Sequence, residues 1–177
     1  ERVERTVHIL NQRAHEIFDI VLQSPSPFVD FPDNITAPTI GPERFSRYCV
    51  PLYNRLAEML AESGRPVFVH MDGDLKALWK QIGECGVGGL DSFSPAPDND
   101  TTVEDAVRLW PEMILFMNFP SSVHLRSRDE VMAEARRILK LAGSSGRLQV
   151  QLSENVPYSV WRTSLPAIAD AIDEFHS

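Results

Sequence analysis

The feature that most constrains the fold is a regular alternation between short apolar runs and longer amphipathic segments. The apolar runs predict strands, and they lie at residues 18–22, 66–70, 86–93, 113–118 and 148–152. The amphipathic segments predict helices, and they lie at residues 1–16, 42–62, 75–85, 102–110, 128–142 and 164–175. Because a helix follows each strand, the strands should be parallel and joined by right-handed crossovers. The sequence therefore predicts an α/β fold for residues 1–177 as a single domain.

Two architectures fit this alternation, namely an open doubly wound sheet and part of an eight-stranded barrel. A complete barrel typically needs about 250 residues, whereas this chain has 177. Five units would leave a barrel open, so missing sequence or a second chain would have to cover the exposed strand edge. The first residue is Glu1 rather than Met, which leads us to expect that the chain starts inside a longer gene product.

Local signals refine two of these segments. Residues 24–38 are rich in proline and polar groups and predict a long loop between the first strand and the second helix. Pro42 suits the first turn of that helix, and Pro51 lies inside it and predicts a kink.

Composition narrows the classes of partner. The formal net charge of −8 argues against binding to nucleic acid or to an anionic membrane surface. No apolar run approaches the ~20 residues that span a bilayer. Cys49 and Cys85 form no short-spaced pair, so neither a disulfide scaffold nor a thiolate zinc cluster is indicated. We therefore expect a reduced, cytoplasmic setting.

Polar side chains follow every predicted strand at the end where parallel α/β folds bind ligands. In chain order they are Asp30, Asp33 and Asn34, then His70, Asp72 and Asp74, then Asp91 and Ser92, then Asn118, and finally Ser153, Glu154 and Asn155. Parallel strands should deliver these residues to one rim although they are far apart in sequence.

His70 and Asp72 form the sharpest single feature of that set. Residues two apart in an extended chain point to the same side, so this imidazole and carboxylate can bind one divalent metal or act as a proton-transfer pair. The alternative is a hydrogen-bonded histidine at a strand end beside a turn acid. Asp74 should cap the following helix, and we expect His124 at the surface.

Three longer segments resemble the uroporphyrinogen decarboxylase superfamily, which includes zinc-dependent, corrinoid-linked methyltransferases. The first segment resembles the family's helix and the strand that closes on His-x-(Cys or Asp)-Gly, and it reads ITAPTIGPERFSRYCVPLYNRLAEMLAESGRPVFVHMDGDLKAL. The second resembles a strand-loop-helix unit and reads MILFMNFPSSVHLRSRDEVMAEARRIL. The third resembles the closing strand, loop and helix and reads LQVQLSENVPYSVWRTSLPAIADAIDEF. The resemblance covers nearly the whole chain and implies the last five units of a (β/α)8 barrel of the TIM type.

The resemblance also implies a metal site with altered ligands. His70 matches the histidine ligand of the methyltransferases, Asp72 stands at the first cysteine position, and Glu154 stands near the second. A His-Asp-Glu set is harder than His-Cys-Cys, so it can hold zinc or prefer manganese or iron. The decarboxylases carry a His-Gly pair in the last loop, where this chain reads Ser153-Glu154-Asn155.

Three functions follow as hypotheses. The first is a metal-dependent methyltransferase-type enzyme acting on a small anionic or methylated substrate, with His70, Asp72 and Glu154 as catalytic residues and metal ligands. The second is a metal-free decarboxylase in which His70 stabilises a carbanion or holds carboxylates. The third is a non-catalytic barrel that binds a ligand or a corrinoid carrier protein.

Further residues and partners complete these hypotheses. The residues expected to contact substrate are Asp33, Asn34, Asp91 and Asn118. Each of these residues has an alternative role. Asp33 and Asn34 are also typical turn formers. Asp91 could be purely structural, and Glu154 could be a solvated acid in a loop. A corrinoid would reach the chain only through a partner protein, and self-association could cover the open barrel edge.

Overall fold

A computed structural model describes residues 1–153 and 156–177 of the chain. Its strands are β1 (Val29–Phe31), β2 (Val67–His70), β3 (Gly89–Phe93), β4 (Ile114–Phe119) and β5 (Leu148–Leu152). Its α-helices are α1 (Arg2–Leu22), α2 (Ala37–Arg44), α3 (Val50–Leu60), α4 (Trp79–Glu84), α5 (Val103–Leu109), α6 (Arg128–Ala142) and α7 (Trp161–His176). The α/β alternation predicted from the sequence is confirmed.

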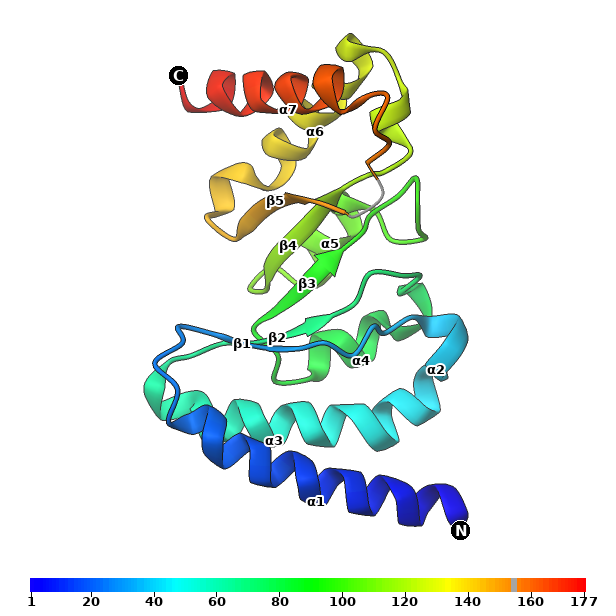
Figure 1. The fold of residues 1–177 in the computed structure, drawn as a ribbon, viewed down its shortest axis with the longest axis vertical. Helices are drawn as coiled ribbons and strands as arrows, with labels where there is room; N and C mark the ends of the chain where they lie inside the picture. Colours follow the sequence, from blue (N-terminus) through cyan, green and yellow to red (C-terminus); the bar gives the residue numbers. More distant parts are fainter. Residues whose placement is uncertain (154–155) are drawn as a thin grey trace.

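The strands form one parallel sheet in the order β1-β2-β3-β4-β5. A doubly wound sheet would reverse its strand order at a switch point, whereas here each strand pairs with the next strand along the chain. Figure 1 shows α1 and α3 flanking the β1–β2 end of the sheet and α6 and α7 flanking the β4–β5 end. The order and the flanking helices are those of a partial TIM barrel.

The first strand lies later in the chain than the sequence predicted. Residues 18–22 continue α1 as helix, and the edge strand β1 forms at Val29–Phe31, inside the predicted loop. The physical reason is that Ala14, Phe18 and Val21 repeat at helical spacing and pack on the core as one face of α1. A strand of three residues is too short to show an alternating pattern of its own.

The kink expected at Pro51 takes the form of a local change in helix type. Residues Phe45–Cys49 form a π-helical turn between α2 and α3, and Pro51 lies in the first turn of α3. A proline is tolerated there because the first N–H groups of a helix have no intrahelical acceptor. A second kink lies within α2, where Gly41 has a φ of 70°.

Helix starts in the second half of the chain follow from capping residues. Ser127 and Glu130 form a capping box at the start of α6, and Thr102 accepts a hydrogen bond from the Asp105 amide at the start of α5. The caps satisfy backbone N–H groups in the first turn of each helix, which have no intrahelical acceptor.

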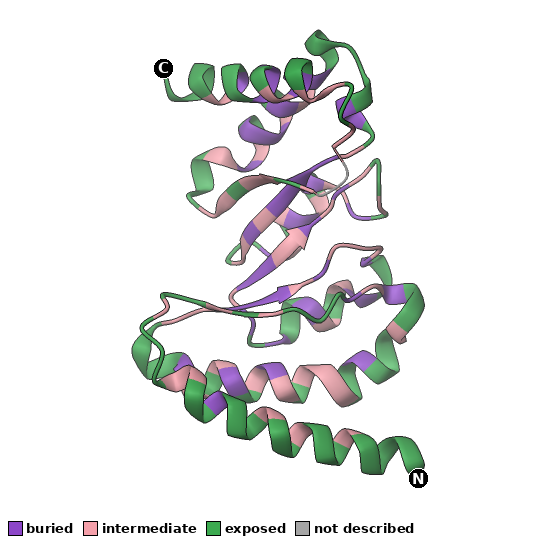
Figure 2. Cartoon of the chain, in the orientation of Figure 1, coloured by how far each residue is buried: buried purple, intermediate pink, exposed green. Residues whose placement is uncertain are grey.

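The core lies between the sheet and the helices. Val67, Val69, Leu90, Leu115 and Met117 point to this side from the strands and are at most 3% exposed. Figure 2 shows buried segments along the strands and along one side of α3 and α6, with exposed segments on the outside of the helices. The opposite face of the sheet carries the candidate site.

Candidate functional site

The face of the sheet opposite the core has an aromatic layer. Phe68 on β2 and Phe116 on β4 stack with 4.4 Å between ring centroids, and the ring of Phe28 lies 5.3 Å and 5.7 Å from them. The intervening strand β3 permits this stacking because it carries Gly89 between the rings. A Cβ atom at Gly89 would lie 2.4 Å from Cε1 of Phe68 and 2.4 Å from the carbonyl oxygen of Ile114, too close for any other residue.

A polar layer lies one step further along the same strands. His70 and Asn118 follow Phe68 and Phe116 by two residues, so they point to the same face. His70 pairs in register with Asp91, and Asn118 pairs in register with Gln151. The strands thus bring together residues that are far apart in sequence, as the sequence predicted.

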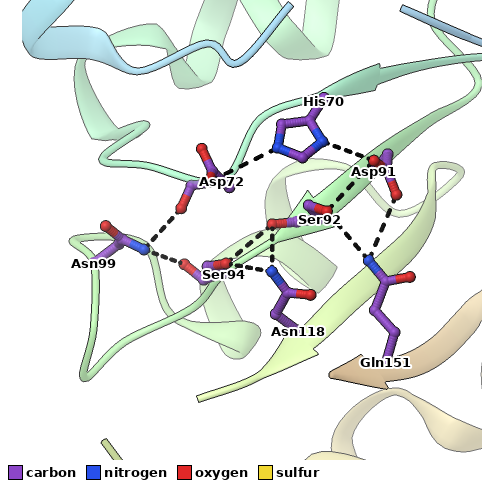
Figure 3. A network of polar contacts seen from close by, with 8 residues as sticks. All are labelled: His70, Asp72, Asp91, Ser92, Ser94, Asn99, Asn118 and Gln151. Carbon is purple, nitrogen blue, oxygen red and sulfur yellow. Dashed lines mark hydrogen bonds and ion pairs between the residues drawn. The ribbon is translucent and has the colours of Figure 1, made fainter. Parts of the chain in front are cut away.

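His70 lies between two carboxylates (Figure 3). Its Nδ1 is 2.9 Å from Oδ2 of Asp91, and its Nε2 is 3.7 Å from Oδ2 of Asp72. The His70 side chain is 29% exposed, so this imidazole is accessible to a ligand. A carboxylate at Nδ1 favours the tautomer in which Nδ1 carries the proton and Nε2 presents a lone pair.

A β-bulge lies in β3 beside Asp91, the residue that pairs in register with His70. Between Leu90 and Phe93 the strand β3 has one residue more than the paired segment of β4 from Leu115 to Met117. Ser92 lies in this bulge with a φ of 54°, a conformation that serine rarely adopts. Bulges are common next to active sites, and this one adjoins the carboxylate that contacts Nδ1 of His70.

Hydrogen bonds hold the bulge from β4 and β5. Nδ2 of Asn118 donates to the carbonyl oxygen of Ser92 at 3.3 Å and to Oγ of Ser94 at 2.9 Å. Nε2 of Gln151 lies 3.5 Å from Oδ1 of Asp91 and 3.4 Å from Oγ of Ser92. Asn118, predicted as a substrate contact, is only 6% exposed, and its side-chain amide donates to residues of the bulge.

Asp72 is held through its backbone. Nδ2 of Asn99, in the loop between β3 and α5, donates to the carbonyl oxygen of Asp72 at 2.9 Å and to that of Ser94 at 3.0 Å. The Asp72 side chain is 40% exposed. Asn99, Ser94 and Gln151 were not predicted as site residues, and no spacing pattern in the sequence marks them.

Asp33 and Asn34 lie in the loop after β1, next to the end of β2. The Ile35 amide donates to the carbonyl oxygen of His70 at 3.0 Å, which ties this loop to the rim. Asp33 accepts a 2.6 Å hydrogen bond from the hydroxyl of the buried Tyr53, and Asn34 has a φ of 49°. The structure therefore gives both residues a role in the loop conformation, while the Asp33 side chain remains exposed.

Asp30 is a further acid on the face that carries His70. It lies on β1 in register with Phe68. Desolvation by the surrounding protein is the main cause that raises its pKa, the charge of Asp91 raises it further, and the charge of His70 opposes the rise. A strand-end acid was expected here, but its electrostatic coupling to Asp91 and His70 depends on the strand register.

Two further predictions concern Glu154 and His124. Glu154 lies outside the described residues; Ser153 beside it shares a 2.7 Å hydrogen bond with Ser121, between their hydroxyl oxygens. The prediction that His124 is exposed is wrong, because its side chain is 1% exposed and its Nδ1 contacts Oγ of Ser164. The prediction that Asp74 caps the following helix is wrong, because its carboxylate accepts from the Asp100 amide. The Leu75 and Lys76 amides at the start of that helical turn donate to Asp100 instead.

The donors at the rim suit a divalent cation in part. His70 offers an imidazole nitrogen and Asp72 a carboxylate, a pair that fits zinc, manganese or iron. Within residues 1–153 and 156–177, no group of three His, Cys, Asp or Glu side chains is placed to hold a metal ion. A third ligand would therefore have to come from Glu154, from movement of a described side chain or from the substrate.

Comparison with known proteins identifies the family. A family model described as uroporphyrinogen decarboxylase (URO-D) matches residues 1–175. The chain belongs to the uroporphyrinogen decarboxylase family. The URO-D match spans α1 to α7, so every strand end that contributes to the rim lies inside the family domain.

A solved structure supports the fold of this URO-D domain. A methyltransferase from Methanosarcina mazei superposes with a TM-score of 0.63 and 16% sequence identity over 85% of this chain. The chain spans 43% of the length of that methyltransferase, so the match shows the shared fold over less than half of it. No curated protein sequence matches the chain. Among the described residues, no helix is long and apolar enough to cross a membrane.

Proposed function

We propose that this URO-D domain is part of a metal-dependent methyltransferase-type enzyme that acts on a small substrate. The observation that carries the proposal is the placement of His70 between Asp91 and Asp72, with the two carboxylates facing opposite nitrogens of the ring. Metal-binding histidines commonly donate their second nitrogen to a carboxylate, which fixes the tautomer and raises the basicity of the ligand. Asp91 would take this outer role, leaving Nε2 of His70 and Asp72 to face the metal, with Glu154 as the third ligand.

Each residue has a defined task in this proposal. A divalent cation at His70 and Asp72 would act as a Lewis acid toward the heteroatom of the substrate. Asp91 keeps the proton on Nδ1, and Asp33 and Asn34 orient the substrate from the β1 loop. Methyl exchange with a corrinoid would require a carrier protein at the same rim.

The direct test is metal binding by isothermal titration calorimetry and by elemental analysis, with Zn²⁺ and Mn²⁺ as the probes. We expect one site in the wild type and a loss of affinity of about 100-fold or more in His70→Ala, which is ~2.7 kcal/mol. His8→Ala is the matched control, because His8 is exposed on α1. A wild-type protein that binds neither metal would remove the proposal.

The second candidate is a metal-free decarboxylase, and the raised pKa of Asp30 is the observation that favours it. Loss of carbon dioxide from a substrate leaves a carbanion, and Asp30, on the face that carries His70, would relay from solvent the proton that completes the product. Protonated His70 would hold the departing carboxylate. Carbon dioxide release that persists under chelation and disappears in Asp30→Asn would favour this candidate over the first.

A non-catalytic barrel is the remaining alternative. It would be indicated if the double variant Asp72→Asn, Glu154→Gln still bound metal or corrinoid while no turnover was detected.

A further inference from the structure

The two carboxylates that face His70 come from different parts of the chain. Asp91 lies in the bulge of β3, and Asp72 lies in the loop after β2. Their oxygens meet opposite nitrogens of one imidazole at 2.9 Å and 3.7 Å. The placement of both therefore depends on what holds the bulge and what holds the loop.

Asn118 holds the bulge. A left-handed conformation at a serine is strained and persists only where surrounding contacts impose it. The amide of Asn118 donates to the Ser92 carbonyl, and the Ser94 hydroxyl donates to the same carbonyl at 3.0 Å. These bonds fix the peptide that follows Ser92, one residue after Asp91, and the bond from Asn118 comes from a nearly buried side chain on β4.

Asn99 holds the loop after β2, and it does so through Ser94, the same residue that contacts Asn118. Its single Nδ2 atom bridges the carbonyl oxygens of Asp72 and Ser94. Ser94 is thus bonded to both asparagines, through its hydroxyl to Asn118 and through its carbonyl to Asn99. Figure 3 shows this chain of contacts running from Asn118 through Ser94 and Asn99 to Asp72.

We propose that Asn118 and Asn99 are positioning residues that set Asp91 and Asp72 against the two nitrogens of His70. Asn118 acts through the bulge and determines which ring nitrogen carries the proton. Asn99 acts through the Asp72 backbone and determines how close the second carboxylate comes to Nε2. The inference rests on the proposed function in taking His70 as the reactive group, but the geometry it describes can be measured without metal or substrate.

The first measurement is the tautomer of His70 from its ¹⁵N chemical shifts at about pH 8.5, where histidines are normally neutral. In the wild type we expect the proton on Nδ1. In Asn118→Ala we expect a mixture of the two tautomers or a preference for Nε2–H, because the bulge relaxes and Asp91 moves away. In Asn99→Ala we expect the wild-type tautomer, because Asp91 is still held.

The second measurement is the affinity for Zn²⁺. Loss of an outer partner of a metal ligand typically weakens metal binding 10- to 100-fold, and we expect losses of about this size in both variants. Asn54→Ala is the matched control. Its Oδ1 accepts from the Gly86 amide at 2.7 Å, before β3 begins, so its loss should change affinity less than about twofold.

The outcomes separate the two proposals. A folded Asn118→Ala protein with the wild-type tautomer and affinity would overturn the positioning role. If Asn118→Ala does not fold, Ser94→Ala removes the shared hydroxyl while leaving the buried amide, and its expected tautomer shift is the same. If the wild type binds neither Zn²⁺ nor Mn²⁺, the proposed function fails, and the tautomer result alone then decides the positioning role.

Discussion

His70 and His124 both lie at or just after the end of a strand, yet their surroundings are opposite. His70 ends β2, and His124 lies in the short helical turn Val123–Leu125 after β4. His70 faces two carboxylates and remains accessible. His124 is 1% exposed, packs 5.0 Å from the Phe119 ring, and has an Nε2 with no hydrogen-bond partner among the described residues.

The difference teaches that a place near the strand ends does not make a histidine part of a site. Burial lowers the pKa of His124 and outweighs the opposing charge of Asp98, so the neutral ring serves as packing and joins the β4 loop to Ser164 on α7. His70 has charged partners and access to solvent. The comparison predicts that His124 supports stability and that His70 supports chemistry.

The largest expected effect is that of His124→Ala. Removing a buried ring leaves a cavity and an unpaired Ser164 hydroxyl, so we expect a loss of about 3 kcal/mol in the free energy of unfolding. Urea unfolding followed by circular dichroism measures it, with the exposed His8→Ala as control. A loss for His70→Ala greater than that for His124→Ala would reverse the comparison.

The pH dependence of stability gives a second test of His124. Its folded pKa lies below the unfolded value of 6.5, so the unfolded state takes up a proton first as pH falls. The stabilisation is complete above pH 6.5 and is lost progressively as pH falls toward the folded pKa, at up to about 1.4 kcal/mol per pH unit. His124→Leu should flatten the profile below pH 6.5, whereas Asp98→Asn should steepen it. An unchanged profile in His124→Leu would show that another group titrates there.

A smaller effect of opposite sign is expected at Asp30. Its folded pKa lies above the unfolded value of 3.8, so its contribution is most favourable below that pH and is lost as pH rises through the folded pKa. At pH 7 its charge is therefore a cost, reduced by solvent because the side chain is exposed. Asp30→Asn should raise the unfolding free energy by a few tenths of a kcal/mol at pH 7, measured by thermal unfolding. A destabilised Asp30→Asn protein would contradict the assignment.

A change in stability as small as that of Asp30→Asn is expected for His70→Ala. A partly exposed side chain outside the core should alter the unfolding free energy by no more than about 0.5 kcal/mol, while ligand binding is lost. Equal losses of stability and binding would mean that His70 is structural.

The sequence predicted much of the fold because strand and helix periods are local. The run at Val67–His70 and the helix after Ser127 lie where periodicity and capping place them. The meeting of His70 with Asp91 followed from parallel strand ends. Residues 18–22 were assigned wrongly because a short apolar run fits either period, and tertiary packing decided in favour of α1.

The network around the site was less predictable for a physical reason. The bulge at Ser92 is a single extra residue in β3, and it leaves no trace in the apolar pattern. Asn99 reaches Asp72 from a loop, and Gln151 reaches Asp91 only because β5 lies next to β4 in register. Contacts of this kind depend on register and loop shape, which single residues in a sequence do not encode.

The stacked rings of Phe68 and Phe116 have a consequence for how ligands reach the site. They close the sheet face below His70, and the absence of a side chain at Gly89 lets them do so without a gap. The rings thus cover the sheet face on the amino-terminal side of His70. Under the proposed function, a small substrate and a bulky methyl donor would both approach His70 from the carboxyl-terminal ends of the strands, where they would compete for the same space.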